Sequence, residues 1–160
     1  SEYMIEKMDG PWKVWFNPKM GGPGEVEFET LYDWTVSADP GIKYYSGTAV
    51  YKKSLQLSLS GDHIFIDLGD PGYIARVFVN SKEAGVVWCS PWSLDITGYL
   101  TEGRNDIEIH VANSLANRMI YDETLPENQR VTYITDPIVS AKDKLKSSGL
   151  KEVKIIRQKK

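Results

Sequence analysis

The feature that most constrains the fold is a run of alternating apolar and polar residues at positions 105–113. Aliphatic side chains alternate there with charged or polar ones, in the order Asp106, Ile107, Glu108, Ile109, His110, Val111. Successive side chains of a β-strand point to opposite faces of the sheet. The pattern therefore predicts a strand with one face in a core and the other in water.

Three further apolar runs precede this strand, at residues 63–69, 73–80 and 83–88. Turn-forming pieces separate them, among them Asp70-Pro71-Gly72 and Asn80-Ser81-Lys82. In the second run alternate residues share a face, with Ala75, Val77 and Val79 on one side and Ile74, Arg76 and Phe78 on the other. Closely spaced short strands separated by turn residues are typical of an antiparallel sandwich or barrel. The sequence therefore predicts an all-β fold.

The flanking segments extend this pattern. We expect a strand at residues 12–16, a loop at 17–24, and a strand at 25–29 that continues toward residue 34 and whose glutamates suit a sheet edge. Residues 46–59 are predicted to form a pair of strands with a bend at Lys53, and residues 150–156 a closing strand. Residues 1–9 are expected to be an extended lead-in, and residues 141–146 a helical turn ended by Gly149.

The length of 160 residues predicts a single domain, residues 1–160, with a core that needs no metal or disulfide. No apolar run approaches the roughly 20 residues of a membrane helix. The chain starts at Ser1 without a basic and apolar leader, so we expect a mature piece or a domain excised from a larger protein. Cys89 is the only cysteine, and its place beside Trp88 in an apolar run predicts a buried thiol.

Charge is concentrated at the end of the chain. Residues 141–160 hold eight Lys or Arg and two acids, although the whole chain has a net charge of −3. A basic end can indicate a nucleic-acid or membrane contact. Here the lysines are interleaved with apolar residues such as Val153 and Ile155, and no aromatic residue accompanies them for base stacking. We therefore expect a solvated last strand, with no nucleic acid and no membrane as partner.

One ordered set of residues runs through most of the chain. Its members are Asp33-Trp34, residues 44–53, Leu68-Gly69, residues 75–80, Gly85, Trp88, Pro91, Asp95-Ile96-Thr97, Leu100, Gly103, Asn105, Ile107, Asn113, Asn117-Arg118, Asp122 and Ser148-Gly149-Leu150. This set resembles the sugar-binding, jelly-roll domain of family 2 glycoside hydrolases, and still more closely the β-sandwich of the bacterial α-L-rhamnosidases. The resemblance covers residues 34–156. The family has Asn-Gly where this chain has Asn80-Ser81, so a non-glycine residue must adopt a positive φ in that turn.

The resemblance implies an antiparallel β-sandwich of jelly-roll, galactose-binding-like type. It also implies an accessory module of a secreted or periplasmic bacterial glycoside hydrolase. The implied partners are the catalytic domain of the same polypeptide and carbohydrate. In these families the catalytic carboxylates lie on a separate α/β barrel, which needs roughly 200–250 residues. This chain has neither the length nor the alternation of strands and helices for a barrel, so we expect no enzyme activity of its own.

The residues themselves offer little catalytic chemistry. His63 and His110 are the only histidines, neither stands in a triad context, and the sequence has no Gly-x-Ser-x-Gly motif. Two histidines and one cysteine do not make a zinc-site spacing. We expect no cofactor. A structural calcium ion is compatible with sandwiches of this kind, although the sequence has no ordered Asp/Asn ladder for it.

Residues 113–137 show no sustained helical or strand period, and loops of this length are often functional. A sugar site combines an aromatic platform with amide, carboxylate and guanidinium groups. By the resemblance this loop reaches toward the catalytic barrel. The carbohydrate-binding candidates are therefore Asn117, Arg118, Tyr121 and Asp122, with Trp88 and Trp92 as neighbouring platforms. Two structural interpretations stay open: Arg118 and Asp122 pin the loop as an ion pair, and the two tryptophans are core residues.

The predicted function is that of a non-catalytic accessory β-sandwich module, which braces a catalytic domain and contributes carbohydrate contacts from one loop edge. One alternative is a free-standing carbohydrate-binding module, which an exposed pair of tryptophans would favour. Another is a purely structural interaction domain, which an exposed apolar patch without a polar pocket would favour.

Overall fold

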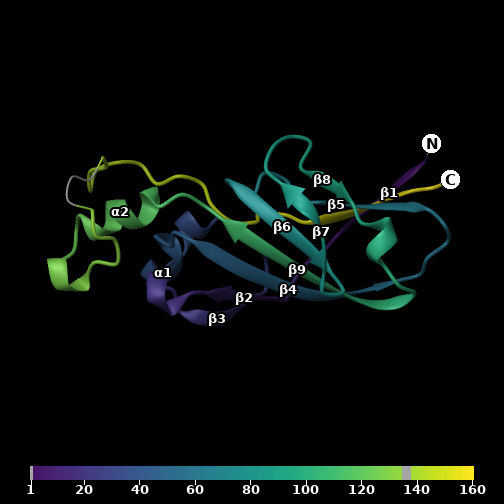
Figure 1. Cartoon of the computed structure of the whole chain (residues 1–160), viewed down its shortest axis with the longest axis horizontal. Coiled ribbons are helices and arrows are strands. Elements are labelled where there is room, and N and C mark those ends of the chain that lie inside the picture. Colours follow the sequence, from purple (N-terminus) through teal and green to yellow (C-terminus); the bar gives the residue numbers. More distant parts are fainter. Residues whose placement is uncertain (1, 135–137) are drawn as a thin grey trace.

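The computed structural model describes residues 2–134 and 138–160, which form two antiparallel β-sheets with a shared core (Figure 1). One sheet has four strands in the order β1-β10-β5-β8, and the other has six in the order β3-β2-β4-β9-β6-β7. The strands are β1 (Tyr3–Lys7), β2 (Trp12–Phe16), β3 (Gly24–Phe28), β4 (Thr48–Leu57), β5 (His63–Asp67), β6 (Ile74–Val79), β7 (Lys82–Val87), β8 (Ser93–Asp95), β9 (Gly103–Ala112) and β10 (Lys154–Gln158). The predicted all-β antiparallel sandwich is confirmed.

Helical structure is confined to short segments between the strands. These are α1 (Pro40–Lys43), α2 (Ala116–Asp122) and the 3-10 turns η1 (Pro18–Met20), η2 (Trp34–Val36), η3 (Thr97–Tyr99) and η4 (Glu127–Gln129). None of the helices in the described part of the chain is long and apolar enough to span a membrane.

The central strands lie where the alternating pattern predicts them. Ile107, Ile109 and Val111 of β9 point into the core and are at most 1% exposed. β6 lies between β7 and β9, and its alternate residues Ala75, Val77 and Val79 are fully buried. Asn80 and Ser81 join β6 to β7 with φ angles of 51° and 69°. The turn therefore adopts the positive φ that the missing glycine would otherwise supply.

Several expectations for the flanking segments are wrong. β4 is one ten-residue strand that pairs with β9 along its whole length, without a break at Lys53. Residues 1–9 contain a true strand, because β1 pairs with β10. β3 ends at Phe28 and residue 34 begins η2, residues 141–146 form no helix, and the closing strand starts only at Lys154. Pairing with strands distant in sequence decides these segments, and local periodicity does not report it.

The prediction of a buried Cys89 is also wrong. Val87, the last residue of β7, is 4% exposed, whereas the next residue Trp88 is 67% exposed and Cys89 is exposed as well. The apolar run continues in the sequence beyond the strand that carries it into the core. Once the strand ends, its alternation no longer predicts which side chains are buried.

The interior contains a buried hydrogen-bonded cluster around the hydroxyl of Tyr51 on β4. Trp34 Nε1 donates a hydrogen bond to this oxygen at 2.7 Å, and the backbone amide of Leu150 donates a second at 3.3 Å. All three residues are fully buried. Gly149 has a φ of 88°, and a Cβ there would lie 2.3 Å from Trp34 Nε1. The segment before β10 is therefore held against β4 and η2 by a buried polar contact that only glycine allows to form.

We expect Tyr51→Phe to lower the free energy of unfolding by about 2–4 kcal/mol, because it leaves two buried N–H groups without an acceptor. The measurement is urea denaturation at neutral pH. The matched control is Tyr73→Phe, since Tyr73 is 63% exposed and should change stability by less than about 0.5 kcal/mol. Equal effects of the two substitutions would contradict the role assigned to the Tyr51 hydroxyl.

Candidate functional site

The predicted loop that follows β9 contains a helix. α2 covers Ala116–Asp122 and lies at one end of the molecule (Figure 1). Its buried residues are Asn117, Arg118, Met119, Ile120 and Asp122. Three of these five are polar or charged, so the buried face of the helix has no apolar period, and the sequence pattern could not reveal it. Residues 135–137, the end of the predicted loop, lie outside the described residues.

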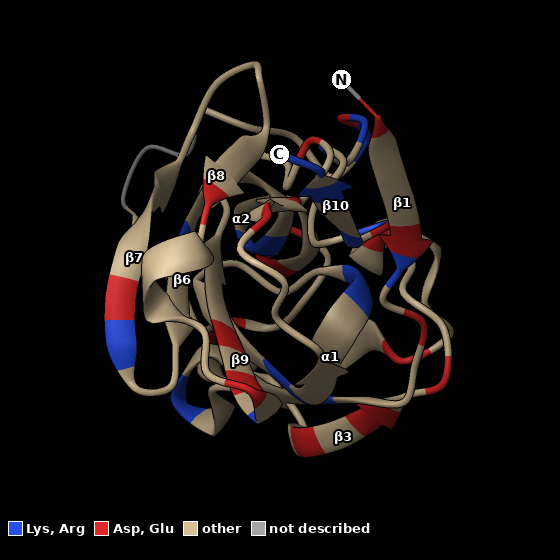
Figure 2. Ribbon diagram, turned by 90° about the vertical axis from the view of Figure 1, so that its right-hand side faces the viewer, with Lys and Arg blue, Asp and Glu red and all other residues tan. Residues whose placement is uncertain are grey.

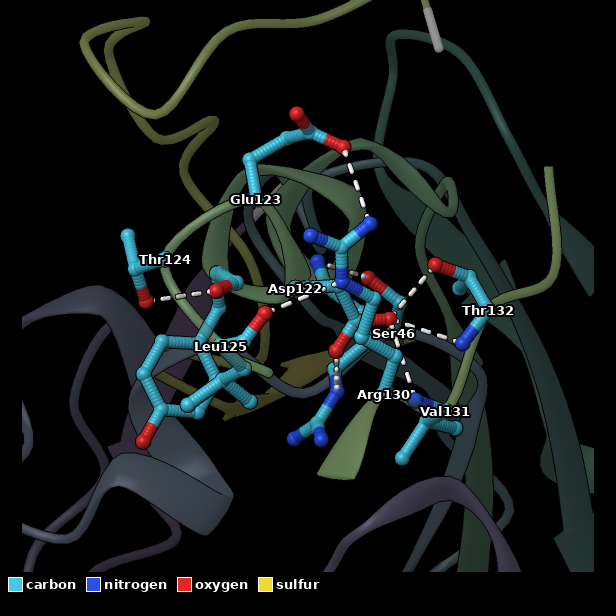
Figure 3. A network of polar contacts seen from close by, with 10 residues as sticks. Ser46, Asp122, Glu123, Thr124, Leu125, Arg130, Val131 and Thr132 are labelled. Carbon is cyan, nitrogen blue, oxygen red and sulfur yellow. Dashed lines mark hydrogen bonds and ion pairs between the residues drawn. The ribbon is translucent and has the colours of Figure 1, made fainter. Parts of the chain in front are cut away.

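Arg118 and Asp122 form a buried ion pair. Arg118 Nε donates to Asp122 Oδ1 at 3.0 Å, and the two side chains are 7% and 2% exposed. Asp122 Oδ2 accepts three more hydrogen bonds, from the amides of Val131 and Thr132 and from the hydroxyl of Thr132 (Figure 3). The carboxylate therefore fixes the segment after η4, at Val131 and Thr132, against α2. A carboxylate with both oxygens occupied in this way is suited to organising a loop.

The guanidinium of Arg118 is enclosed by backbone and aromatic groups. A Cβ at Gly21, which follows η1 with a φ of 81°, would lie 2.7 Å from Arg118 Nη1. The guanidinium carbon is 5.1 Å from the centre of the Tyr121 ring, and Tyr121 stacks on Tyr44 with ring centroids 4.1 Å apart. Within residues 2–134 and 138–160, Nη1 and Nη2 of Arg118 have no hydrogen-bond acceptor. The Arg118 guanidinium thus packs against the segment at η1, and the Arg118 amide donates to Ser46 Oγ at 2.9 Å.

Asn117 connects α2 to the segment that leads to β10. Its Nδ2 donates to the carbonyl of Lys146 and its Oδ1 accepts from the amide of Lys146, both at 2.7 Å. Asn113, just after β9, donates from its Nδ2 to the hydroxyl of Ser148 and to the carbonyl of Tyr45. Both amide side chains take the place of a backbone partner. The segment that leads to β10 is positioned largely by side chains, because no strand in the described part of the chain pairs with it.

Asp33 holds the same segment through Ser147 and Ser148. Ser147 Oγ donates to Asp33 Oδ2 at 2.6 Å, and the Ser148 amide donates to Oδ1 at 3.2 Å. Burial alone would raise the pKa of the Asp33 carboxyl, but these hydrogen bonds, together with those from Thr35, hold the pKa below its usual value. The charged form of Asp33 is therefore favoured in the folded state.

The space beside Asp122 is too small for a sugar. The hollow lined by Met119, Asp122, Glu123, Arg130, Thr132 and Ile134 has a volume of about 10 Å³. That is room for at most about one water molecule. Glu123 Oε1 lies 3.9 Å from Arg130 Nη1 at its rim (Figure 3). Among the described residues, this end of the molecule provides anchored polar groups around a hollow that is too small for a sugar ring.

The two candidate tryptophans lie in the connection between β7 and β8, away from α2 (Figure 1). Trp88 is largely exposed, whereas Trp92 is half-buried and packs against the core. The structure thus brings Asn117, Arg118, Tyr121 and Asp122 together, but it does not bring the tryptophans to them. Whether any of these residues contacts carbohydrate stays a prediction.

The sequence-based candidates for a sugar platform do not include Trp15, although this tryptophan faces outward. Trp15 on β2 is 40% exposed, while its neighbours Val14 and Phe16 are fully buried. The alternation that predicts the strand at residues 12–16 also places Trp15 on the outer face, so the signal was present in the sequence. Within the described residues, no three His, Cys, Asp or Glu side chains gather closely enough to hold a metal ion.

We expect Arg118→Ala to destabilise the protein by about 2–4 kcal/mol, because it leaves the buried carboxylate of Asp122 without its counter-charge. The matched control is Arg104→Ala, since Arg104 pairs with Asp106 at 3.3 Å with both side chains about two-thirds exposed. Removing such an exposed pair should cost less than about 1 kcal/mol. Unchanged stability of the Arg118 variant in urea denaturation would contradict a bracing role and favour a role in ligand binding.

The pH dependence of the stability of Asp33→Asn tests the contact between Asp33 and the segment before β10. Because the folded-state pKa of Asp33 lies below its unfolded value, the stabilisation is present above that unfolded pKa and is lost as pH falls through the folded pKa. We therefore expect the variant to be less stable than the wild type at about pH 7 and the difference to shrink toward about pH 3. Urea denaturation at several pH values measures this. Asp9→Asn, at an exposed position, is the control and should leave the pH profile unchanged.

No protein-family model matches this chain. Among curated proteins, it is 39% identical over 121 residues to a protein named "Putative beta-glucuronidase" from Formosa agariphila, a match that covers 73% of this chain and 10% of that protein. The structure of a rhamnosidase from Novosphingobium sp. PP1Y superposes with a TM-score of 0.92 and 34% identity, over 99% of this chain and 15% of the rhamnosidase chain. A beta-glucuronidase from Ruminococcus gnavus superposes with a TM-score of 0.70 and 20% identity, over 98% of this chain and 28% of that chain.

The rhamnosidase match runs from one end of this chain to the other at a level of identity well above that of the glucuronidase structure. The glucuronidase structure supports the fold alone. The chain spans only 10–15% of the length of the curated relative and of the rhamnosidase. The resemblance predicted from the sequence is confirmed: this chain is similar to the β-sandwich part of much longer glycoside hydrolases.

Proposed function

We propose that residues 1–160 form a non-catalytic accessory module of a glycoside hydrolase of the rhamnosidase type, and that the module braces the catalytic domain of the same polypeptide. The observation that carries the proposal is the end-to-end match to a segment making up 15% of a rhamnosidase, with a TM-score of 0.92. The galactose-binding-like character of the module and a secreted or periplasmic location of the parent enzyme belong to the same proposal.

The state of the carboxylates supports a non-catalytic role. Glycoside hydrolysis needs two carboxyl groups that face one bond, about 5–9 Å apart, one of them able to give up a proton. Asp122 is 2% exposed and accepts four hydrogen bonds. The neighbouring Glu123 faces Arg130. Within the described residues, the hollow that both acids line measures about 10 Å³, which is too small for a sugar ring.

The α2 end suits a brace. Arg118, Asn117 and Asp122 tie α2 to η1, to the segment before β10 and to the segment after η4. Beyond these anchors the end carries exposed apolar side chains, with Tyr133 87% and Leu115 46% exposed. A surface with rigid support and an apolar exterior is suited to packing against another domain. We infer that any carbohydrate contact from Asn117, Arg118, Tyr121 or Asp122 is completed by that domain.

A second candidate, a free-standing carbohydrate-binding module that uses Trp88 and Trp92, has one observation in its favour. Trp88 is 67% exposed. Trp92, however, is packed against the core, so the two rings do not offer a shared exposed platform. The accessory role is therefore preferred to binding through this pair.

The isolated chain should not hydrolyse aryl glycosides of rhamnose, galactose or glucuronic acid, because Asp122 is buried in an ion pair with Arg118 and Glu123 faces Arg130. The assay is release of nitrophenol by the purified chain. Activity that survives repurification and disappears in Asp122→Ala would contradict the proposal.

The bracing role is tested by the thermal stability of the whole polypeptide. The polypeptide that carries this chain should, without residues 1–160, unfold at a lower temperature and lose activity on heating sooner than the intact polypeptide. The surface is tested by Tyr133→Ser in the intact polypeptide, which should lower the unfolding temperature, whereas Tyr73→Ser, at another exposed tyrosine, should not. Equal thermal unfolding with and without the module would overturn the brace.

A further inference from the structure

Two adjoining hollows lie on the outer face of the six-stranded sheet. They measure about 600 and 310 Å³ and share Lys13, Lys52 and Glu108 in their walls. Most of their lining comes from β2, β3, β4 and β9, and none of it comes from α2. We call the joined hollows the outer groove. Ligand pockets in proteins commonly measure about 300–1,000 Å³, so the outer groove is large enough for an oligosaccharide.

Strand register decides which side chains meet in the outer groove. Trp15 on β2 stands between Glu25 on β3 and Val50 on β4, and Val50 stands opposite His110 on β9. Two residues along β2, the next outward-facing row is Glu27, Lys13, Lys52 and Glu108. Outward-facing residues of neighbouring strands form such rows because side chains alternate between the two faces. The groove is therefore a property of the sheet and not of a mobile loop.

Trp15 gives the outer groove an aromatic surface. The residue is 40% exposed, and the half-buried side chains of Val50 and His110 continue the row beside it. His110 is itself supported by Phe78, with ring centroids 4.7 Å apart. An indole face next to hydrogen-bonding groups suits a ligand with one apolar face and a polar edge. A pyranose ring has this character.

The charges in the outer groove are balanced. Four basic residues (Lys13, Lys52, Lys53, Arg104) and four acidic residues (Glu25, Glu27, Asp106, Glu108) line it. The acidic bands of β3 and β9 are visible in Figure 2. Lys52 pairs with Glu108 and Arg104 with Asp106, both at 3.3 Å. In residues 2–134 and 138–160, Lys13, Glu25 and Glu27 have no ion-pair partner.

This balance selects among ligand classes. A polyanion would require an excess of basic residues, because its affinity comes from neutralising its charges. Hydroxyl groups both donate and accept hydrogen bonds, so they match a surface that offers ammonium donors and carboxylate acceptors side by side. A neutral sugar chain fits the outer groove better than a nucleic acid or a uronic-acid polymer.

We propose that the outer groove binds a neutral oligosaccharide, with one sugar ring against Trp15 and hydroxyl groups paired with Lys13, Glu25 and Glu27. The site is separate from α2 and goes beyond the bracing role. A variant that loses sugar binding in the outer groove therefore leaves the bracing role of the α2 end measurable, and the reverse also holds.

The test is an NMR titration of the isotope-labelled 160-residue chain with neutral hexasaccharides of β-1,4-linked glucose, xylose and mannose and of α-linked rhamnose, each up to about 10 mM, well above a millimolar dissociation constant. At least one probe should shift the Trp15 indole signal and the amide signals of β2, β4 and β9. Trp15→Ala should weaken binding by about tenfold or more, equivalent to about 1.4 kcal/mol. The matched control Tyr73→Ala removes an exposed aromatic residue outside the groove and should leave affinity unchanged.

Trp15 faces outward, so the amide spectrum of Trp15→Ala should stay that of a folded β-sandwich, and the comparison of affinities does not depend on refolding. Several results would overturn the proposal. These are no shift with any of the neutral probes, shifts confined to Trp88 or α2, or stronger binding of a hexamer of galacturonic acid in the same groove. Concentration-dependent shifts of the groove without sugar would assign the face to a second copy of the chain instead.

Discussion

The buried hydroxyl of Tyr51 joins three parts of the chain that are distant in sequence, and the positioning of α2 depends on that junction. By accepting hydrogen bonds from Trp34 and Leu150, it fixes the segment before β10 against the six-stranded sheet. The same segment supplies the backbone groups of Lys146 that hold Asn117. At the other end of α2, Asp122 accepts hydrogen bonds from the amides of Val131 and Thr132 and so positions the segment after η4. A chain of satisfied polar contacts thus extends from the core to the exposed end, where the described residues form no β-ladder to organise the backbone.

The polar chemistry of the molecule is divided between two regions with different character. At α2 the charged and amide groups are buried and hydrogen-bonded to one another. On the outer face of the six-stranded sheet, in contrast, charged groups surround an exposed indole and several of them lack ion-pair partners in the described part of the chain. Buried polar groups that satisfy each other specify a structure, whereas exposed ones that do not are available to a ligand. The residues most suggestive of a sugar site in the sequence are therefore the ones most occupied with holding the fold.

Period-two alternation predicted the central strands and the burial of Ile107, Ile109 and Val111. In a half-buried antiparallel strand, apolar residues on the core face alternate with polar residues on the solvent face, so the sequence itself shows which side chains are buried. The same rule failed where pairing with a distant strand decides the backbone, as in the uninterrupted pairing of β4 with β9 and in the strand at Tyr3–Lys7. Of the candidate site, the ion pair of Arg118 with Asp122 followed from their spacing of four residues. The helix that carries it did not, since its buried face is largely polar. The exposure of Trp88 and the outer groove depend on where strands end and which rows meet, which are properties of the assembled sheet.

The antiparallel pairing of β1 with β10 has a mechanical consequence. Tyr3 is opposite Gln158 and Lys7 is opposite Lys154, so the two ends of the chain leave the sheet on the same side (Figure 1). A force that pulls the ends apart acts across this pair of strands, and it breaks their hydrogen bonds one after another, as a zipper opens, instead of loading them all together. β1 is an edge strand whose residues are all exposed, so little packing resists its removal. Under tension β1 would peel away first, while the core around Tyr51 and the anchored α2 at the far end would bear no load until that strand had gone.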